Sequence, residues 1–264
     1  MLKIIITGVF GRVGSTILNL ALNDKDIAVV GVIESKTHPM VGKTLDRVSS
    51  ATNDPLNIEG NLAAIIEKCD VVIDFTEPRA SLDYFRIARK NKKAIVIGTT
   101  GFSEDALAEI RGSIDTRVVI SPNMSIGMNL MFEIVDKLSR IMKDDYDIEI
   151  VEMHHKMKKD APSGTAVRLK DIVQASEPAR NWIEISGRKG IIGERKREEI
   201  GVLALRGGDV VGEHTVMFAG VGERLEVTHR AYSRENFARG AFLAAKWLIS
   251  QPDGIYSMKD VLGI

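Results

Sequence analysis

The chain has 264 residues, enough for one large domain or two modest ones with a sizeable buried core. Lys plus Arg equals Asp plus Glu at 36 each, and this zero formal net charge argues against nucleic acid or an anionic membrane as the main partner. No apolar run approaches the roughly 18 residues of a membrane span, and Gly8 interrupts the N-terminal stretch too early for a signal peptide. The single cysteine, Cys69, cannot form an internal disulfide and is expected in the core, so a cytoplasmic protein is predicted.

The first half of the chain alternates buried-looking strands with helices. Strands are predicted at 2–7, 28–33, 71–75, 94–97 and 117–120, and helices at 12–22, 62–68, 78–91 and 104–111. This alternation predicts an α/β fold with a Rossmann-like parallel-sheet dinucleotide domain. Ligands of such sheets bind at the carboxyl ends of the strands, where Gly, Pro, Ser, Thr and Asn gather in this sequence.

A glycine run, Gly8-x-x-Gly11-x-x-Gly14, follows the first strand and departs from the common G-x-G-x-x-G spacing. A plain tight turn would also explain it, but the loop opens a helix whose free N–H groups favour a pyrophosphate. Glu34 ends the second strand, 20 residues after Gly14, where a carboxylate can bind an adenosine ribose; a solvated glutamate is the alternative. The serine and lysine after Glu34 could receive a 2′-phosphate that Glu34 would repel, so both NADH and NADPH stay open.

The second half has a different order of elements. A helix at 126–142, a strand at 147–154 and a helix from Ser163 to about 175 precede strands at 200–205, 210–219 and 224–232. This order predicts a smaller α+β domain with a mixed or antiparallel sheet. A last helix, 233–249, is expected to pack back on the first half. The predicted dinucleotide-binding domain is therefore residues 1–125 and 235–264, the second domain is 126–234, and a hinge is expected near 125 and 235.

The stretch EIVEMHHKMKKDAPSGTAVRLK, residues 149–170, places two histidines and three lysines before Asp-Ala-Pro-Ser-Gly-Thr. Neighbouring His154 and His155 point to opposite faces of a strand, so no metal pair, and no metal, is expected. Ser163 is predicted to cap a new helix whose first N–H groups, with the lysines, form an anion pocket. Histidine supplies a proton near neutral pH. The stretch predicts a site that holds and protonates a carboxylate compound, although a capped helix after a basic loop also fits.

The run from Glu152 to Ala166 resembles the signature of the dihydrodipicolinate reductase family, whose members are also called 4-hydroxy-tetrahydrodipicolinate reductases. GVFGRVG, DFTEP, IGTTG, PNMSIGMNLM, GEHTVMF and GERLEVTHRA resemble further family segments in their usual order, so the resemblance covers almost the whole chain. It implies that NADH or NADPH reduces a cyclic imine dicarboxylate to tetrahydrodipicolinate, with loss of water, in the diaminopimelate route to lysine. It also implies that the second domain binds substrate and joins the chain into a homotetramer.

The resemblance further implies roles for individual residues. His154 is the expected general acid and Lys158 the second proton-donating, carboxylate-binding group, while His155, Gly164 and Thr165 are expected to bind substrate. Met124 stands where the family usually has phenylalanine, and Ser35 where NADPH-competent members often carry arginine. The expected nucleotide contacts are Gly8, Val9, Phe10, Gly11, Arg12, Val13, Glu34, Gly98, Thr99, Thr100, Ser121, Pro122, Asn123 and Met124.

Two other functions fit parts of the sequence. A two-domain oxidoreductase acting on another amino acid would keep the glycine loop but has no reason to keep His-His-x-x-Lys and Ser-Gly-Thr together. A nucleotide-sensing regulator would need a DNA-binding or partner-binding segment, and the zero net charge without a helix-turn-helix pattern argues against one. The reductase is therefore the predicted function.

Overall fold

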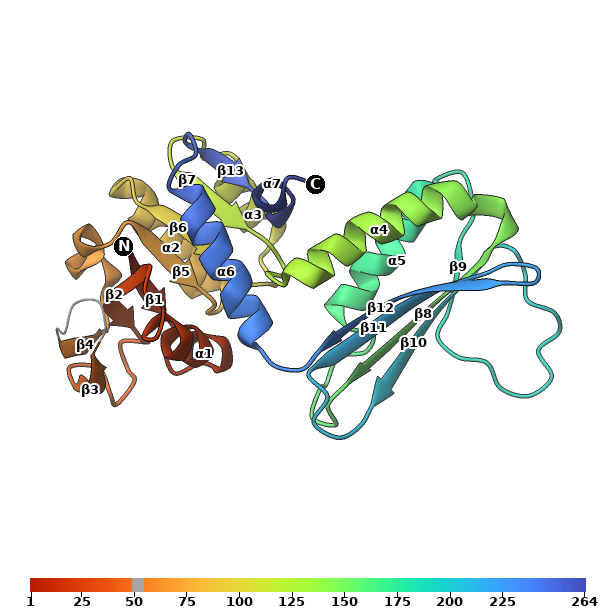
Figure 1. Cartoon of the computed structure of the whole chain (residues 1–264), viewed down its shortest axis with the longest axis horizontal. Coiled ribbons are helices and arrows are strands. Elements are labelled where there is room, and N and C mark those ends of the chain that lie inside the picture. Colours follow the sequence, from red (N-terminus) through yellow and green to blue (C-terminus); the bar gives the residue numbers. More distant parts are fainter. Residues whose placement is uncertain (49–54) are drawn as a thin grey trace. The chain divides into compact units, whose positions relative to one another are not determined.

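The computed structural model describes residues 1–48 and 55–264, which divide into two compact units (Figure 1). Unit 1 is Met1–Ile126 together with Arg234–Ile264, and unit 2 is Gly127–Ser233. The chain therefore leaves unit 1 once and returns to it.

Unit 1 is built on a largely parallel sheet with the strand order β13-β7-β6-β5-β1-β2-β4-β3 in the described part of the chain. Neighbouring strands from β7 to β2 are parallel, which confirms the predicted Rossmann-like sheet. Short β-branched runs form these strands because both faces of the sheet are covered by helices. The central strands are β1 (Leu2–Thr7), β2 (Ile27–Ile33), β5 (Val71–Asp74), β6 (Ala94–Ile97) and β7 (Arg117–Ile120).

Successive side chains of these strands enter different hydrophobic clusters, as expected when a strand is buried on both faces. Ile4 and Ile6 of β1 pack in the same cluster as α1, α6 and α7, whereas Ile5 joins the cluster of α2 and α3. Cys69 is buried in the second cluster, as expected. The helices are α1 (Arg12–Ala21), α2 (Pro78–Lys90), α3 (Glu104–Arg111), α6 (Glu235–Leu248) and α7 (Met258–Leu262).

The prediction of one helix at 62–68 is wrong. Asn61 does cap the segment, because its side chain accepts a hydrogen bond from the Ala63 N–H, but Ile65 interrupts the turns with a φ of −126°. Two 3-10 turns result, η1 (Leu62–Ala64) and η2 (Ile66–Lys68). Seven residues are too few for an independently stable helix, and burial of Leu62, Ile65 and Ile66 in the core decides the backbone.

Short strands at the sheet edges are absent from the prediction. β4 (Pro55–Glu59) pairs with β2 in parallel, and β3 (Thr44–Val48) runs antiparallel to β4. β13 (Gly254–Tyr256) adds to β7. Each has only three to five residues, so hydrophobic periodicity has too few positions to reveal it.

Unit 2 is a five-stranded sheet with the order β12-β11-β8-β10-β9 in the described residues. β8 is parallel to β10 and antiparallel to β11, which confirms a mixed sheet. Alternate residues of β8, including Ile148 and Ile150, pack against α4 and α5. The elements are α4 (Ile126–Met142), η3 (Lys143–Asp145), β8 (Asp147–His154), α5 (Gly164–Ser176), β9 (Ile183–Ile185), β10 (Glu199–Arg206), β11 (Gly212–Ala219) and β12 (Arg224–Ala231).

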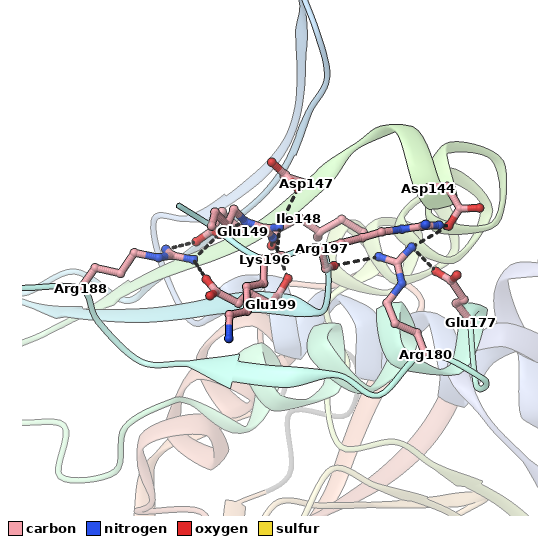
Figure 2. Close-up of polar contacts among 11 residues, drawn as sticks. Asp144, Asp147, Ile148, Glu149, Glu177, Arg180, Arg188, Lys196, Arg197 and Glu199 are labelled. Atoms are coloured by element: carbon pink, nitrogen blue, oxygen red, sulfur yellow. Dashed lines mark hydrogen bonds and ion pairs between the residues drawn. The ribbon is translucent and has the colours of Figure 1, made fainter. Parts of the chain in front are cut away.

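The opposite face of this sheet carries charged and apolar side chains that are at least partly exposed, and Leu205 is 51% exposed. Glu149 of β8 lies on this face and anchors both ends of the loop between β9 and β10 (Figure 2). Its carboxylate accepts bonds of 3.0 and 2.9 Å from Arg188 and one of 3.1 Å from Arg195. The base of this loop is thereby tied to the sheet.

Candidate functional site

A cleft of about 900 Å³ lies in unit 1, where β1, β2, β4 and β5 reach their carboxyl ends. Of the predicted nucleotide contacts, Gly8, Gly11 and Glu34 line it. Its walls also include residues outside the individually predicted nucleotide contacts, among them Asn61, Phe75, Thr76, Arg79 and Tyr84. Ligands bind at this edge of parallel sheets, so the position agrees with a dinucleotide site.

The glycine loop lies tightly against the first turn of α1. Gly8 has a φ of +63°, a left-handed conformation that strains any residue with a side chain. A Cβ atom on Gly14 would lie only 2.1 Å from the Gly8 carbonyl oxygen, and one on Gly11 would lie 3.0 Å from the same atom. Gly11 and Gly14 thus allow the loop to pack closely on the first turn of α1, and a helix N-terminus that follows such a loop favours an anion such as a pyrophosphate.

Glu34 joins the end of β2 to the glycine loop. One carboxylate oxygen accepts a 3.0 Å bond from the Phe10 N–H and the other accepts a 2.8 Å bond from the Ser35 N–H. The Phe10 ring stacks on His38 with 4.8 Å between the centroids. Each carboxylate oxygen has a second lone pair, so Glu34 can still accept hydrogen bonds from ribose hydroxyls.

A buried carboxylate fixes three strand ends beside this cleft. Asp74 accepts hydrogen bonds from the hydroxyls of Thr7, Thr76 and Thr99 at 2.5, 2.7 and 2.8 Å. The Thr99 hydroxyl in turn accepts a 2.9 Å bond from the Thr76 N–H. β1, β5 and β6 are thus held together where the predicted contacts Gly98 to Thr100 begin.

The remaining predicted nucleotide contacts differ in exposure. Val9 and Met124 are each 1% exposed and pack in the core of unit 1, so their side chains are not available to a cofactor. Arg12 and Val13 lie in the first turn of α1. Ser121, Pro122 and Asn123 follow β7, and the Ser121 hydroxyl donates to the Asn123 carbonyl at 2.8 Å.

In unit 2, His154 ends β8 two residues after Glu152, so the two side chains lie on the same face of the strand. The Nδ1 atom of His154 lies 2.6 Å from a Glu152 carboxylate oxygen, and Glu152 is fully buried. Arg206 of β10 binds both oxygens of Glu152, at 2.8 and 2.9 Å. His155 follows the strand and is half-buried.

The same carboxylate also holds the start of α5. Glu152 accepts a 3.0 Å bond from the Ser163 N–H, and the Ser163 hydroxyl accepts a 3.2 Å bond from the Ala166 N–H as the predicted N-cap. Gly164 and Thr165 are the first two residues of α5, and their N–H groups have no partner within the helix. Apart from its chain neighbours and the backbone of α5, no atom of the described chain lies within 4 Å of a Cβ placed on Gly164, so there is open space beside this residue.

Lys158 lies in the loop between His154 and this helix. Its ammonium group donates to both oxygens of Asp160, at 2.9 and 2.8 Å, and contributes an electrostatic interaction with His154. A cation, an imidazole and free helix N–H groups therefore occur together at one end of β8. Such a combination can bind a carboxylate and transfer a proton.

Burial and charge set the protonation of these groups. Burial lowers the pKa of His154, and Lys158 and Arg206 lower it further, while Glu152 acts in the opposite direction. Burial raises the pKa of Glu152, but the bonds from Arg206, His154 and the backbone outweigh it, so this pKa stays below its usual value. Glu152 is therefore ionised at neutral pH and accepts a hydrogen bond from the His154 ring.

His214 of β11 is a further histidine at this site. Its Nε2 atom lies 3.0 Å from the Ser163 hydroxyl and its ring meets that of His154 edge-on, with 5.2 Å between the centroids. Burial lowers the pKa of His214 to about 3, so it is neutral. Within the described residues, no group of three or more His, Cys, Asp or Glu side chains is placed to hold a metal ion.

The sequence missed Glu152 and Arg206 as site residues. Glu152 is separated from His154 by one residue, so a strand pattern could have placed it on the same face. Arg206 is 54 positions from Glu152, and only the pairing of β10 with β8 brings them together.

Among the helices described by the structure, none is long and apolar enough to cross a membrane.

These features define an α/β protein of the dinucleotide-binding class: a parallel sheet, a glycine loop at a helix N-terminus, and the Glu34 carboxylate at the end of β2. Residues 2–124 match the family model for the N-terminus of dihydrodipicolinate reductase, and residues 127–262 match the model for its C-terminus. The chain belongs to the dihydrodipicolinate reductase family.

Full-length relatives agree with this assignment. The chain is 46% identical to a 4-hydroxy-tetrahydrodipicolinate reductase of Syntrophus aciditrophicus (strain SB) over 265 residues, 100% of this chain and 99% of the relative. It is also 46% identical to the protein of that name from Geotalea uraniireducens (strain Rf4), with both chains covered completely.

Among solved structures, a dipicolinate-bound dihydrodipicolinate reductase from Paenisporosarcina sp. TG-14 is similar with a TM-score of 0.79 and 23% identity, and 98% of this chain and 99% of that chain are covered. An amine dehydrogenase from Mycobacterium smegmatis shares the fold at a TM-score of 0.60 and 12% identity, over 97% of this chain and 95% of that chain. At these identities the two structures bear on the fold alone.

Proposed function

We propose that this chain is an NAD(P)H-dependent oxidoreductase with 4-hydroxy-tetrahydrodipicolinate reductase activity, in lysine biosynthesis through diaminopimelate. Family membership and the full-length relatives support the activity. The observation that carries the site is the double role of Glu152. This single carboxylate binds both His154 and the residue that caps α5, so a proton donor and anion-binding N–H groups meet at one place.

The proposed mechanism divides the reaction between the two units. The glycine loop and Glu34 would hold the dinucleotide, whose reduced nicotinamide supplies the hydride when bound. His154 donates a proton from Nε2, because its Nδ1 is engaged with Glu152. Lys158 and the N–H groups of Gly164 and Thr165 bind the carboxylates of the substrate and are helped by His155. A bound dianion would favour the protonated form of His154.

The cofactor and the assembly are part of the same proposal. Glu34 suits an unmodified ribose, while exposed Lys36 is a flexible charge that can meet a 2′-phosphate, so both NADH and NADPH are proposed as cofactors. The partly exposed sheet face of unit 2, with Leu205 and neighbouring apolar residues, supports a homotetramer joined through these sheets. A cytoplasmic location stays a prediction.

Two variants test the assigned roles, with oxidation of NADH measured in the presence of the product of dihydrodipicolinate synthase. His154→Ala should lower turnover by roughly 10²–10⁴-fold, the usual effect of losing a positioned proton donor. Binding of NADH should hardly change, because His154 is not part of the unit 1 cleft. Lys158→Ala should in addition weaken substrate binding by about 1.5–3 kcal/mol, the value of a hydrogen bond to a charged group.

The measurements extend from pH 6 to 9 to separate direct from indirect roles. Turnover close to wild type in His154→Ala, with an unshifted pH profile, would remove His154 from catalysis. The proton donor would then be sought at Lys158. Loss of all activity in the wild-type assay would contradict the proposed function itself.

A further inference from the structure

The mechanism gives no role to Arg206 and uses Glu152 only as a partner of His154 and Ser163, although the two residues form one ion pair next to His154, the start of α5 and the loop of Lys158. Glu152 bonds the ring of His154 and the N–H of Ser163. Arg206 donates to both oxygens of Glu152 and also to the Asp160 carbonyl oxygen at 2.6 Å. One ion pair therefore connects β8, β10 and the loop that carries Lys158.

A buried carboxylate is costly unless all of its hydrogen-bonding capacity is used. Glu152 is fully buried and accepts four hydrogen bonds, two from Arg206, one from His154 and one from Ser163. Glu149, three residues earlier, has similar arginine partners but a different environment. It lies on the partly exposed face with Arg188 and Arg195, and its contacts serve the loop base (Figure 2).

The difference between the two glutamates is the imidazole. We infer that Glu152 is a positioning residue that, held by Arg206, fixes the ring of His154 with Nδ1–H bonded to the carboxylate and leaves Nε2 to exchange the proton with substrate. This inference rests on the proposed role of His154 as the proton donor. It adds that the donor's tautomer and orientation are set by a carboxylate that never touches substrate.

The proton balance is simple. The imidazolium form of His154 carries protons on both nitrogens, and the Nε2 proton passes to the reduced substrate while the N–H bonding electrons stay on Nε2. The neutral imidazole that remains keeps its Nδ1–H bond to Glu152, and the carboxylate stays ionised throughout. Arg206 maintains that charge through its two bonds to Glu152.

The groups around His154 determine how the pH profile should respond. Glu152 from β8 favours the imidazolium, whereas Arg206 from β10 and Lys158 from the loop oppose it, and neutral His214 from β11 adds no charge. Removing the carboxylate of Glu152 therefore destabilises the imidazolium, and the rate should begin to fall at a lower pH. A purely structural role would reduce activity without moving the profile.

The test compares Glu152→Gln with Glu149→Gln in the full-length protein. Glutamine keeps the size of the side chain and can still accept from Arg206. Glu152→Gln should lower turnover by about 10–100-fold, by analogy with carboxylates that orient metal-bound histidines, and should move the alkaline limb to lower pH. Glu149→Gln removes the same charge from the same strand and should leave the limb at the wild-type pH.

Two results would overturn the inference. The first is a folded Glu152→Gln protein whose pH profile matches the wild type while His154→Ala is strongly impaired. His154 would then remain the proton donor, and only the positioning role of Glu152 would be refuted. If His154→Ala is itself unimpaired, the proposed function of the site fails instead. A double variant of Glu152 and His154 should lose little more than His154→Ala alone, because the residues act as a unit.

A measurement on the wild-type protein covers the case in which Glu152→Gln does not fold. Nitrogen-15 NMR of the histidine side chains, assigned by comparison with His154→Gln, reports which ring nitrogen carries the proton at high pH. The inference requires the Nδ1–H tautomer for His154. Observation of the Nε2–H tautomer would refute it whatever the variants do.

Discussion

Ser163 should be the most costly helix cap in this protein to remove. Its hydroxyl accepts from the Ala166 N–H and is paired with His214 Nε2 at 3.0 Å, and both side chains are buried. Loss of a serine cap costs about 1 kcal/mol. The buried His214 nitrogen left without its partner costs a further ~1–3 kcal/mol. Ser163→Ala should therefore reduce the free energy of unfolding of unit 2 by about 2–4 kcal/mol.

Ser103 provides a matched control. Its hydroxyl accepts from the Ala106 N–H at 3.3 Å at the start of α3, but Ser103 is exposed and its hydroxyl has no buried imidazole to satisfy. Ser103→Ala should cost only about 1 kcal/mol. Each unit has one tryptophan, Trp182 in unit 2 and Trp247 in unit 1, so urea unfolding followed by fluorescence can report on each unit. Equal losses in the free energy of unfolding for Ser163→Ala and Ser103→Ala would refute the proposed contribution of the His214 contact.

Three further predictions follow from other parts of the structure. Gly11→Val places a branched side chain where a Cβ is already 3.0 Å from the Gly8 carbonyl oxygen. NADH binding should be abolished, while the circular dichroism spectrum stays native. Unchanged NADH affinity by calorimetry would disprove the proposed cofactor site. NADH should serve at least as well as NADPH, because Glu34 repels a 2′-phosphate and Lys36 cannot form the two parallel hydrogen bonds that an arginine makes to a phosphate. A Michaelis constant for NADPH more than tenfold below that for NADH would contradict this. Folding lowers the pKa of His214 from 6.5 to about 3, so its contribution to the free energy of unfolding is present above pH 6.5 and is lost as the pH falls towards 3. His214→Gln should therefore weaken the dependence of the free energy of unfolding on pH in this range. An unchanged dependence would mean that other groups cause the acid sensitivity.

Much of unit 1 could be read from the sequence because its signals are local. β6 is a continuous apolar run and β5 is apolar up to its last residue, Asp74, and the glycines at 8 to 14 mark a tight loop. One local signal was overlooked. Ser257 and Asp260 form a capping box at the start of α7, and the Ser-x-x-Asp spacing is visible in the sequence.

Other features needed the folded chain because their partners are far apart. Asp74 satisfies its charge with hydroxyls from Thr7 and Thr99, which lie 67 and 25 positions away. α6 begins at Glu235, two residues after the predicted start, and Arg234 in the cap position makes no side-chain cap hydrogen bond. Edge strands such as β13 form only when a neighbouring strand offers backbone groups to pair with.

The unit 2 site shows the same division. The sequence by itself gathered two histidines, three lysines and a serine cap in one stretch, because a strand end, a helix start and residue chemistry are properties of consecutive residues. The choice of His154 and Lys158 among them is what the family resemblance implies. Only the tertiary structure decided which carboxylate holds His154 and which cation holds that carboxylate. Arg206 reaches Glu152 because β10 runs parallel to β8 in a particular register, and that register depends on burial of a whole sheet face.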